Sequence, residues 1–353
     1  MSTPHVVVSS LPAGTAFSRY IIALAKMGGD LASAHAYAEA SMRSTPQVAA
    51  TLAELHTKSA VPVGTTTDAT WAGPLAPYGI ATEALTLLRA QSIVGQLEPR
   101  LVRVPLHVYV AHETGAGAVG GWVGEGHPIA VQQTAFESVV EGLYKYGVLV
   151  PLAQELLDFS IPDAEATIRR TVLGGLAKGI DSAFLDPTKA AVGGISPASV
   201  TNGATSITSS GSTAAQISAD LAAMLAAITT PGNGLTWIMR KKTMATIAAA
   251  LGTTSGLPAT LYGLPVIVSD NSPAQITLVD GQGIIYSDSG QFDIGVSKAA
   301  TLQLDTAPTD PPVAATVMTS LWQSNCVGVR ALRWLSWKRI ETGSVVYMTV
   351  TYA

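Results

Sequence analysis

The 353-residue sequence predicts an α+β fold whose outer surface is completed by other chains. Two observations support the fold class. Strand-like runs occupy much of residues 101–152 and 314–352, and a long amphipathic helix is expected over 162–186, between them. A third observation concerns the surface: hydrophobic residues make up 48% of the chain but charged residues only 12%, against about 25% in an ordinary soluble domain.

A chain with so little charge is covered either by a membrane or by partner copies. The mean hydropathy is +0.34. A membrane-spanning helix needs about 20 consecutive apolar residues, and the best apolar stretches, 221–228 and 247–251, are far shorter. No signal peptide is visible at the N-terminus. We therefore expect burial between copies of the chain and no membrane partner.

Residues 1–100 are expected to form an N-terminal arm region that lies on other parts of an assembly. Apolar residues at helical spacing predict one helix over 16–40, weakened near its middle by Gly28-Gly29. From 41 to 100, short helical stretches alternate with connectors rich in Pro, Gly and Thr. This region shows no strong core of its own.

Residues 101–152 are expected to form an extended β-hairpin. Apolar residues alternate with polar ones from 101 to 113, and a second strand-like run covers 134–152. The segment between them is rich in glycine and would form the tip. Because a lone two-stranded hairpin is marginally stable in water, this hairpin should rest on another surface.

The long helix at 162–186 has a clear start and end. Ser160 is placed to cap it, with Pro162 in the first turn and Asp163 three residues after the cap. An unbroken i, i+4 ladder of apolar residues follows, and Pro187 ends it. We expect this helix to be the backbone of a main domain that begins with residues 153–212.

A second α/β region is expected over 213–306, after a low-complexity stretch of Gly, Ser and Thr. Thr213 and Gln216 form a capping-box pattern for its first helix. Strands are predicted at 235–239 and 264–268, with a helix at 243–251. Pro308–Pro312 is interpreted as a linker, and residues 307–353 should return to the main domain as strands.

The sequence predicts no catalytic residue, no cofactor and no metal site. The stretch Gly115–Gly120 matches the G-x-G-x-x-G string, but the residues after it cannot start the helix that a dinucleotide site needs, so a hairpin tip is the better interpretation. His107 and His112 are five residues apart in a strand and fall on opposite faces. A single cysteine, Cys326, excludes an intrachain disulfide and a cysteine-built metal site.

Tight binding to nucleic acid is not expected either. The formal net charge is −4, and the only basic run is Arg240–Lys242. Trp322, Trp334 and Trp337 alternate with basic residues near the C-terminus. In a Val-rich β segment these tryptophans are expected to be core or subunit-interface anchors rather than platforms for bases.

One series of motifs points to a known family. It consists of Trp122-Val-Gly-Glu125-Gly, a return strand leading to Glu155-Leu-Leu-Asp158, and Asp181-Ser-Ala-Phe-Leu-Asp186, followed by Trp237-Ile-Met, Leu261–Val266 and Gln291–Ile294. In order and spacing, across residues 100–350, this series resembles the major capsid proteins of tailed bacteriophages, which have the Hong Kong 97 (HK97-like) fold.

The resemblance implies an arrangement for the predicted segments. Residues 1–100 would include the N-arm, 101–152 would be the E-loop hairpin, 153–212 the P-domain with its spine helix, 213–306 the A-domain, and 307–353 the return strands of the P-domain. Assembly contacts are expected at the E-loop tip and in the P-domain. They are Trp122, Gly124, Glu125, Gly126 and His127 at the tip, and Arg169, Arg170, Trp334, Trp337 and Arg339 in the P-domain.

The resemblance also implies a function. The chain would be a major capsid protein, without enzymatic activity, that assembles as pentamers and hexamers into an icosahedral head around the DNA genome. It would be built into the virion after assembly in the host cytoplasm. Its partners would be other copies of itself, a portal, scaffolding or decoration proteins, and packaged double-stranded DNA bound only non-specifically.

Two departures from the family and two alternatives are noted. Gly126 and His127 stand where some members carry a cross-linking lysine, so no isopeptide bond is expected. The N-terminal region lacks a charged heptad run, so we expect a long, retained arm, with scaffolding supplied by another protein if it is needed.

The alternatives to the capsid function are a nanocompartment shell that encloses a cargo enzyme and a soluble dinucleotide enzyme that uses residues 115–120.

Overall fold

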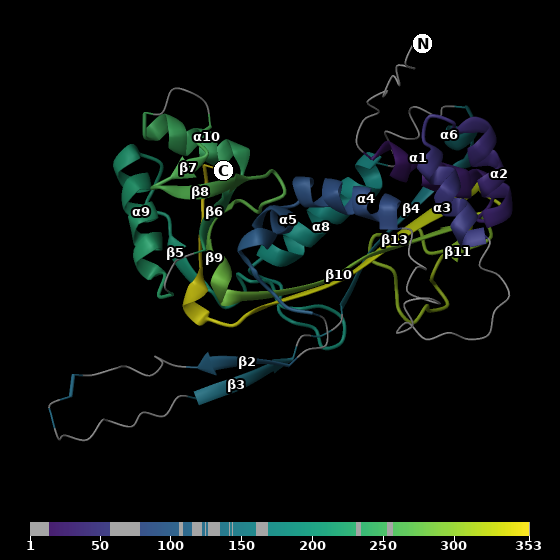
Figure 1. The fold of residues 1–353 in the computed structure, drawn as a ribbon. Coiled ribbons are helices and arrows are strands. Elements are labelled where there is room, and N and C mark those ends of the chain that lie inside the picture. Colours follow the sequence, from purple (N-terminus) through teal and green to yellow (C-terminus); the bar gives the residue numbers. More distant parts are fainter. Residues whose placement is uncertain are drawn as a thin grey trace, which may run out of the picture. The chain divides into compact units, whose positions relative to one another are not determined.

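A computed structural model of the chain, shown in Figure 1, divides into two compact units. The first unit comprises residues 1–96, 145–182 and 290–334, and the second comprises residues 97–144, 183–289 and 335–353. The structure describes residues 14–56, 78–105, 109–114, 122, 123, 125, 135–140, 142, 144–159, 169–230, 234–252 and 257–352.

The described part of the first unit begins with the helices α1 (Thr15–Lys26), α2 (Leu31–Ser41), α3 (Pro46–His56), α4 (Tyr78–Gln91) and the short α5 (Ile93–Leu97). Over residues 16–40 the sequence predicted a single helix, but the structure has two, α1 and α2. The predicted helix is broken because Gly28 and Gly29 have φ angles of +68° and +89°, in the left-handed region that ends a helix. Asp30 then caps α2 by accepting a hydrogen bond from the Ser33 N–H at 2.9 Å.

The described N-terminal helices form part of a core. Phe17 and Ile21 of α1 are completely buried, in one hydrophobic cluster with Val172, Leu176 and Val329. The core is therefore shared with the long helix and β13 of the same unit, so these helices do lie on another part of the chain, in keeping with the expectation that the region has no strong core of its own.

The predicted long helix is described from residue 169 onward. Its described part consists of a π-helical turn (Arg169–Leu173) followed by α8 (Gly174–Leu185). The predicted cap at Ser160 and the first turn lie outside the described residues. Asp181 is fully buried and accepts hydrogen bonds from the Ser92 hydroxyl at 2.6 Å and the Val94 N–H at 3.2 Å. This carboxylate therefore ties the long helix to the start of α5.

A four-stranded sheet contains the longest strands of the molecule's described part. Its order is β1 (Val102–Arg103), β10 (Ile284–Ser297), β13 (Cys326–Arg339) and β4 (Tyr144–Ala153). Accessibility alternates along β4, which fits a strand with one buried face. Helix α6 (Gln154–Phe159) follows β4 directly. The chain between β10 and β13 contains two short strands, β11 (Thr301–Leu302) and β12 (Thr319–Ser320), which pair with each other antiparallel.

The second unit is built on a six-stranded sheet with a nearly continuous apolar centre. Its order is β5 (Thr205–Thr208), β14 (Val345–Thr349), β9 (Gln275–Asp280), β6 (Leu235–Met239), β8 (Leu264–Val268) and β7 (Thr260–Leu261). Every residue of β9 is buried. Helices α9 (Ala214–Ala227) and α10 (Lys241–Ala250) contribute Ile217, Leu221 and Ile247 to the same hydrophobic cluster as the strands.

Local sequence signals in this unit are confirmed, but one long-range pairing was not foreseen. The capping box of Thr213 and Gln216 is present, and the strands predicted at 235–239 and 264–268 are β6 and β8. The terminal strand β14, however, pairs with β5 and β9 in this sheet. The prediction had grouped 345–349 with the other return strands, because a run of apolar residues fits the interior of either sheet equally well.

Candidate assembly surfaces

The predicted hairpin is formed by β2 (Tyr109–Thr114) and β3 (Ala135–Val140), which pair antiparallel from Tyr109–Val140 to Thr114–Ala135. At about 3.4 Å per residue, this ladder is roughly 20 Å long. Among the predicted tip residues, Trp122 is fully exposed and Glu125 is exposed. Gly124, Gly126 and His127 lie outside the described residues, as does the glycine string 115–120.

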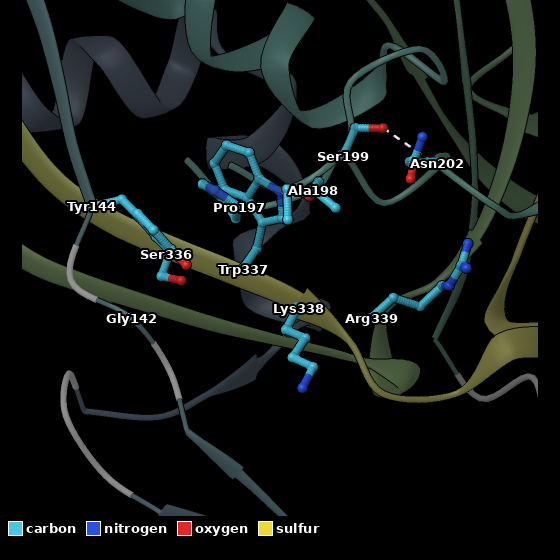
Figure 2. Close-up of a pocket in the computed structure, with 11 residues that line it drawn as sticks. Gly142, Tyr144, Pro197, Ala198, Ser199, Asn202, Ser336, Trp337, Lys338 and Arg339 are labelled. Atoms are coloured by element: carbon cyan, nitrogen blue, oxygen red, sulfur yellow. Dashed lines mark hydrogen bonds between the residues drawn. The ribbon is translucent and has the colours of Figure 1, made fainter. Parts of the chain in front are cut away.

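A pocket of about 350 Å³ lies at the base of this hairpin, in the second unit (Figure 2). Gly142 and Tyr144 line it from the end of the hairpin, and residues 336–339 line it from the end of β13. The remaining wall comes from the loop that follows α8, at Ala191, 197–199 and Asn202. The pocket thus brings together two of the predicted contact residues, Trp337 and Arg339.

Trp337 is an internal anchor of this wall. Its side chain is only 3% exposed and meets the Phe184 ring edge-on, with ring centroids 5.3 Å apart. Its indole N–H donates to the Ala198 carbonyl at 2.8 Å. The ring therefore has little surface left for a neighbouring subunit, and it fixes the loop after α8 instead.

Arg339 holds the same loop further along. Its guanidinium donates to the Val200 carbonyl at 2.8 Å and to the Gly203 carbonyl at 3.0 Å. Burial lowers the pKa of Arg339 from its ordinary value, although the group stays protonated in the neutral range. Lys338, between these two residues, is exposed and makes no hydrogen bond or ion pair with the described residues.

The other predicted P-domain contacts do not line this pocket. Trp334 is half-buried and Arg170 is exposed, and both belong to the first unit. The side chain of Arg169 lies outside what the structure describes. The prediction also missed an exposed apolar loop, residues 303–318, part of which it had interpreted as a linker. The sequence signal for this loop was the apolar pair Val317 and Met318 in a segment without Lys, Arg or His.

The titratable groups do not form a reaction centre among the described residues. Burial raises the pKa values of Tyr20, Tyr146 and Tyr352, and a hydrogen bond from the Thr188 hydroxyl lowers the pKa of Asp186. None of these side chains lines the pocket of Figure 2. No group of His, Cys, Asp and Glu within the described ranges is arranged to hold a metal ion.

The hairpin, the long helix and the two sheets define a mixed α+β fold, and comparison with known sequences identifies the family. Residues 72–331 match the phage capsid family, so the chain belongs to that family. It is also 36% identical, over 362 residues, to a capsid polyprotein of Pseudomonas phage PAJU2. That match covers 96% of this chain and 54% of the relative, so the chain spans about half the relative's length.

Solved structures show the same fold at low sequence identity. A chain of Gordonia phage Cozz is 14% identical, with a TM-score of 0.54 over 73% of this chain and 86% of that one. A chain of Mycobacterium phage Cain is 13% identical, with a TM-score of 0.51 over 71% of this chain and 87% of that one. The predicted α+β, HK97-like capsid fold is confirmed, and membership of a capsid family implies self-association into shells.

Of the alternatives, neither a nanocompartment shell nor a dinucleotide enzyme is favoured by these relatives, and the family is one of structural proteins. Within the described residues, no helix combines the length and the apolar character that crossing a membrane requires.

Proposed function

We propose that this chain is the major capsid protein of a tailed bacteriophage, whose copies assemble as pentamers and hexamers into an icosahedral head around the DNA genome. The observation that carries the proposal is the match of residues 72–331 to the phage capsid family. The low charge of the chain supports it, because a chain with only 12% charged residues has a surface better suited to repeated burial between copies than to water.

The hairpin supplies one set of proposed contacts. A two-stranded ladder is marginal by itself in water, and its tip carries a fully exposed Trp122 beside Glu125. We infer that Trp122, Gly124, Glu125, Gly126 and His127 pack on a neighbouring subunit. A paired ladder roughly 20 Å long separates the tip residues from the pocket along the chain, which supports a contact of the tip with another copy.

Lys338 provides a receptor for that tip. It is exposed at the rim of the pocket in Figure 2 and carries a positive charge opposite in sign to Glu125. Complementary rim charges of this kind guide association more than they add affinity. Arg169, Arg170 and Trp334 are proposed as further contacts of the P-domain, whereas Trp337 and Arg339 act by holding the pocket wall in place.

The remaining parts of the proposal concern chemistry and partners. The chain acts without catalysis or a cofactor, and its role is mechanical. A portal and scaffolding or decoration proteins would complete the particle, which forms in the host cytoplasm and becomes the virion shell. Double-stranded DNA would be enclosed without sequence-specific contacts, in agreement with the net charge of −4 and the single short basic run.

Assembly of the purified full chain tests the proposal. Sedimentation and electron microscopy should find closed shells under assembly conditions, and purified phage particles should contain this chain as their most abundant protein. Trp122→Ser should weaken assembly while leaving the fold of the subunit intact, and Tyr262→Ser, an exposed aromatic residue outside the hairpin, serves as the matched control. A chain that stays monomeric under every assembly condition would contradict the proposal.

A further inference from the structure

The basic run Arg240–Lys242, which has no assigned role in the proposed function, lies where β6 ends and α10 begins (Figure 1). β6 and β8 are parallel neighbours, paired from Trp237–Val266 to Met239–Val268, so their carboxyl ends lie at the same end of the six-stranded sheet. In open α/β sheets, ligands bind outside the carboxyl ends of the parallel strands. The basic run is therefore placed where this fold class binds ligands.

The start of α10 lacks a side-chain cap. The first N–H groups of an α-helix have no partner within the helix, and they carry the positive end of its dipole. Arg240 occupies the N-cap position of α10, and its side chain makes no capping hydrogen bond. The usual N-cap residues offer these N–H groups an oxygen acceptor, which a guanidinium does not have. An oxyanion is the ligand that such a helix start binds.

Two buried hydroxyls beside this turn make no hydrogen bond with any described residue. They belong to Thr243, in the first turn of α10, and to Ser272, in the loop after β8, and these residues are 0% and 1% exposed. Side chains of a helix lean toward its N-terminus, so the Thr243 hydroxyl lies over the first-turn N–H groups. Because a buried hydroxyl without a partner is costly, each of the two requires an ion or an ordered water as its partner.

The loop after β8 is fixed against the start of α10. The Arg240 Nε donates to the Ser272 carbonyl at 2.6 Å, and the Ser269 N–H donates to the Met239 carbonyl, at the end of β6, at 3.0 Å. The terminal nitrogens of the Arg240 guanidinium make no hydrogen bond or ion pair with the described residues. Since a guanidinium binds phosphate through two parallel N–H bonds, Arg240 has donors left for such a group beside Ser272.

The charges around this turn are mainly positive. Arg240 is half-buried, and Lys241 and Lys242 are exposed. The Lys241 ammonium lies 3.8 Å from the Asp270 carboxylate, and both side chains are largely exposed. An exposed ion pair of this kind contributes little free energy, so Asp270 competes only weakly with an anion for Lys241. Three cations and one carboxylate therefore favour an anionic ligand.

We propose that the start of α10 and the loop after β8 bind a phosphate-type oxyanion. Its donors are the first-turn N–H groups, the hydroxyls of Thr243 and Ser272, and the Arg240 guanidinium. The oxygens of a tetrahedral oxyanion accept from all of these together, whereas a single water makes about three hydrogen bonds and gains nothing from the cations. Contact with a phosphate carries no base sequence, so two sources share this chemistry: backbone phosphates of nucleic acid and the free anion.

Titration of the full chain with inorganic phosphate tests the site. Calorimetry at constant ionic strength should find saturable binding to the wild type, and Thr243→Val should weaken it by about tenfold, because a donor to a charged ligand is lost. Thr246→Val, one turn further along α10, is the matched control. Its hydroxyl donates to the Lys242 carbonyl at 3.2 Å, so the phosphate affinity should not change. Equal affinity in Thr243→Val and the wild type, or no saturable binding to the wild type, would overturn the inference and leave the proposed function standing.

Amide hydrogen exchange covers the case in which Thr243→Val does not fold. In the wild-type chain, the Lys241 and Thr243 amides should exchange about fivefold more slowly in phosphate than in chloride of the same ionic strength. The Leu251 amide, which donates to the Ile247 carbonyl at 2.9 Å at the other end of α10, should keep its rate. Equal rates for Lys241 and Thr243 in the two salts would overturn the inference.

A short DNA duplex distinguishes the two sources of phosphate. A duplex that displaces inorganic phosphate from the wild type, and binds Thr243→Val more weakly, assigns the site to backbone phosphates. A duplex that displaces none assigns it to the free anion. Both results require the phosphate binding of the first titration, and the site is overturned if that binding is absent.

Discussion

Two long loops of this chain are similar in sequence but differ in what they do. They are the loop after α8, residues 186–204, and the loop between β11 and β12, residues 303–318. Both are rich in small residues, Thr and Pro, a composition typical of connectors. The first has internal hydrogen bonds, such as that from the Ser199 N–H to the Lys189 carbonyl at 2.9 Å, and is also held from outside by Trp337 and Arg339 of β13. The second is held by its own bonds and exposes its apolar side chains.

The difference shows that composition does not decide whether a loop is structural or interactive. What differs is what reaches each loop from outside. The loop after α8 packs against Trp337 of β13, although its own Val192 and Ile195 are exposed, whereas no comparable large ring packs on the described loop 303–318, whose apolar side chains are exposed. A buried tryptophan therefore contributes to folding, and an exposed one is available for assembly.

The largest expected effect separates the two tryptophans. Trp337→Ala should lower the free energy of unfolding of the dissociated subunit by about 3–5 kcal/mol, because it empties a buried site and leaves the Ala198 carbonyl without its donor. Trp322→Ala should change it by no more than about 0.5 kcal/mol. Urea unfolding measures both, and equal losses would contradict the division between the loops.

The next effect concerns the arginine that holds the first loop. Arg339→Met should cost about 1–3 kcal/mol of unfolding free energy, because the Val200 and Gly203 carbonyls lose their partners. Lys338→Met is the matched control, since this neighbouring side chain is exposed and should change stability by less than about 0.5 kcal/mol. If the two variants unfolded alike, the assigned role of Arg339 would be wrong.

A smaller, local effect is expected in the second loop. Gln303→Ala removes both bonds to Thr309 and should cost about 1 kcal/mol within the loop. The Thr309 amide should then exchange its hydrogen about fivefold faster, while the core amides of β13 keep their rates. Unchanged exchange at Thr309 would show that the loop owes its shape to something else.

The smallest effect is electrostatic and lies at the start of the first loop. The hydrogen bond from the Thr188 hydroxyl holds the pKa of Asp186 below its ordinary value of 3.8. A lowered carboxyl pKa stabilises the fold above the ordinary pKa, and this contribution is lost as the pH falls through the folded value. Thr188→Ala should raise the pKa of Asp186 in an NMR titration, and Thr188→Ser should preserve it. An unshifted pKa in Thr188→Ala would contradict the assigned cause.

Much of the fold follows from local signals in the sequence. The capping box of Thr213 and Gln216 predicts the start of α9, and the alternation of apolar and polar residues predicts the hairpin. The break at Gly28-Gly29 was visible as a weakness, but only the left-handed φ angles make it a boundary between two helices. The pairing of β14 with β5 and β9 has no local signal, because these strands are far apart in the sequence and an apolar strand fits either sheet.

The site was less predictable than the fold, and the tryptophans of β13 show why. Trp334 and Trp337 are three residues apart, so a strand directs them to opposite faces, and only one is buried. The sequence identifies both as anchors but does not say which face meets the core. The exposed loop was missed for a related reason: its apolar residues have no periodicity, and only the structure shows that they share one surface.

The mass of the particle that the purified chain forms tests the central claim most directly. We predict that native mass measurement of the full chain under assembly conditions will find closed particles many times heavier than the 36.3 kDa subunit. A species that remains at 36.3 kDa at every concentration, with Trp122 and Trp322 still accessible to solvent quenchers, would contradict the claim that other copies complete the surface of this molecule.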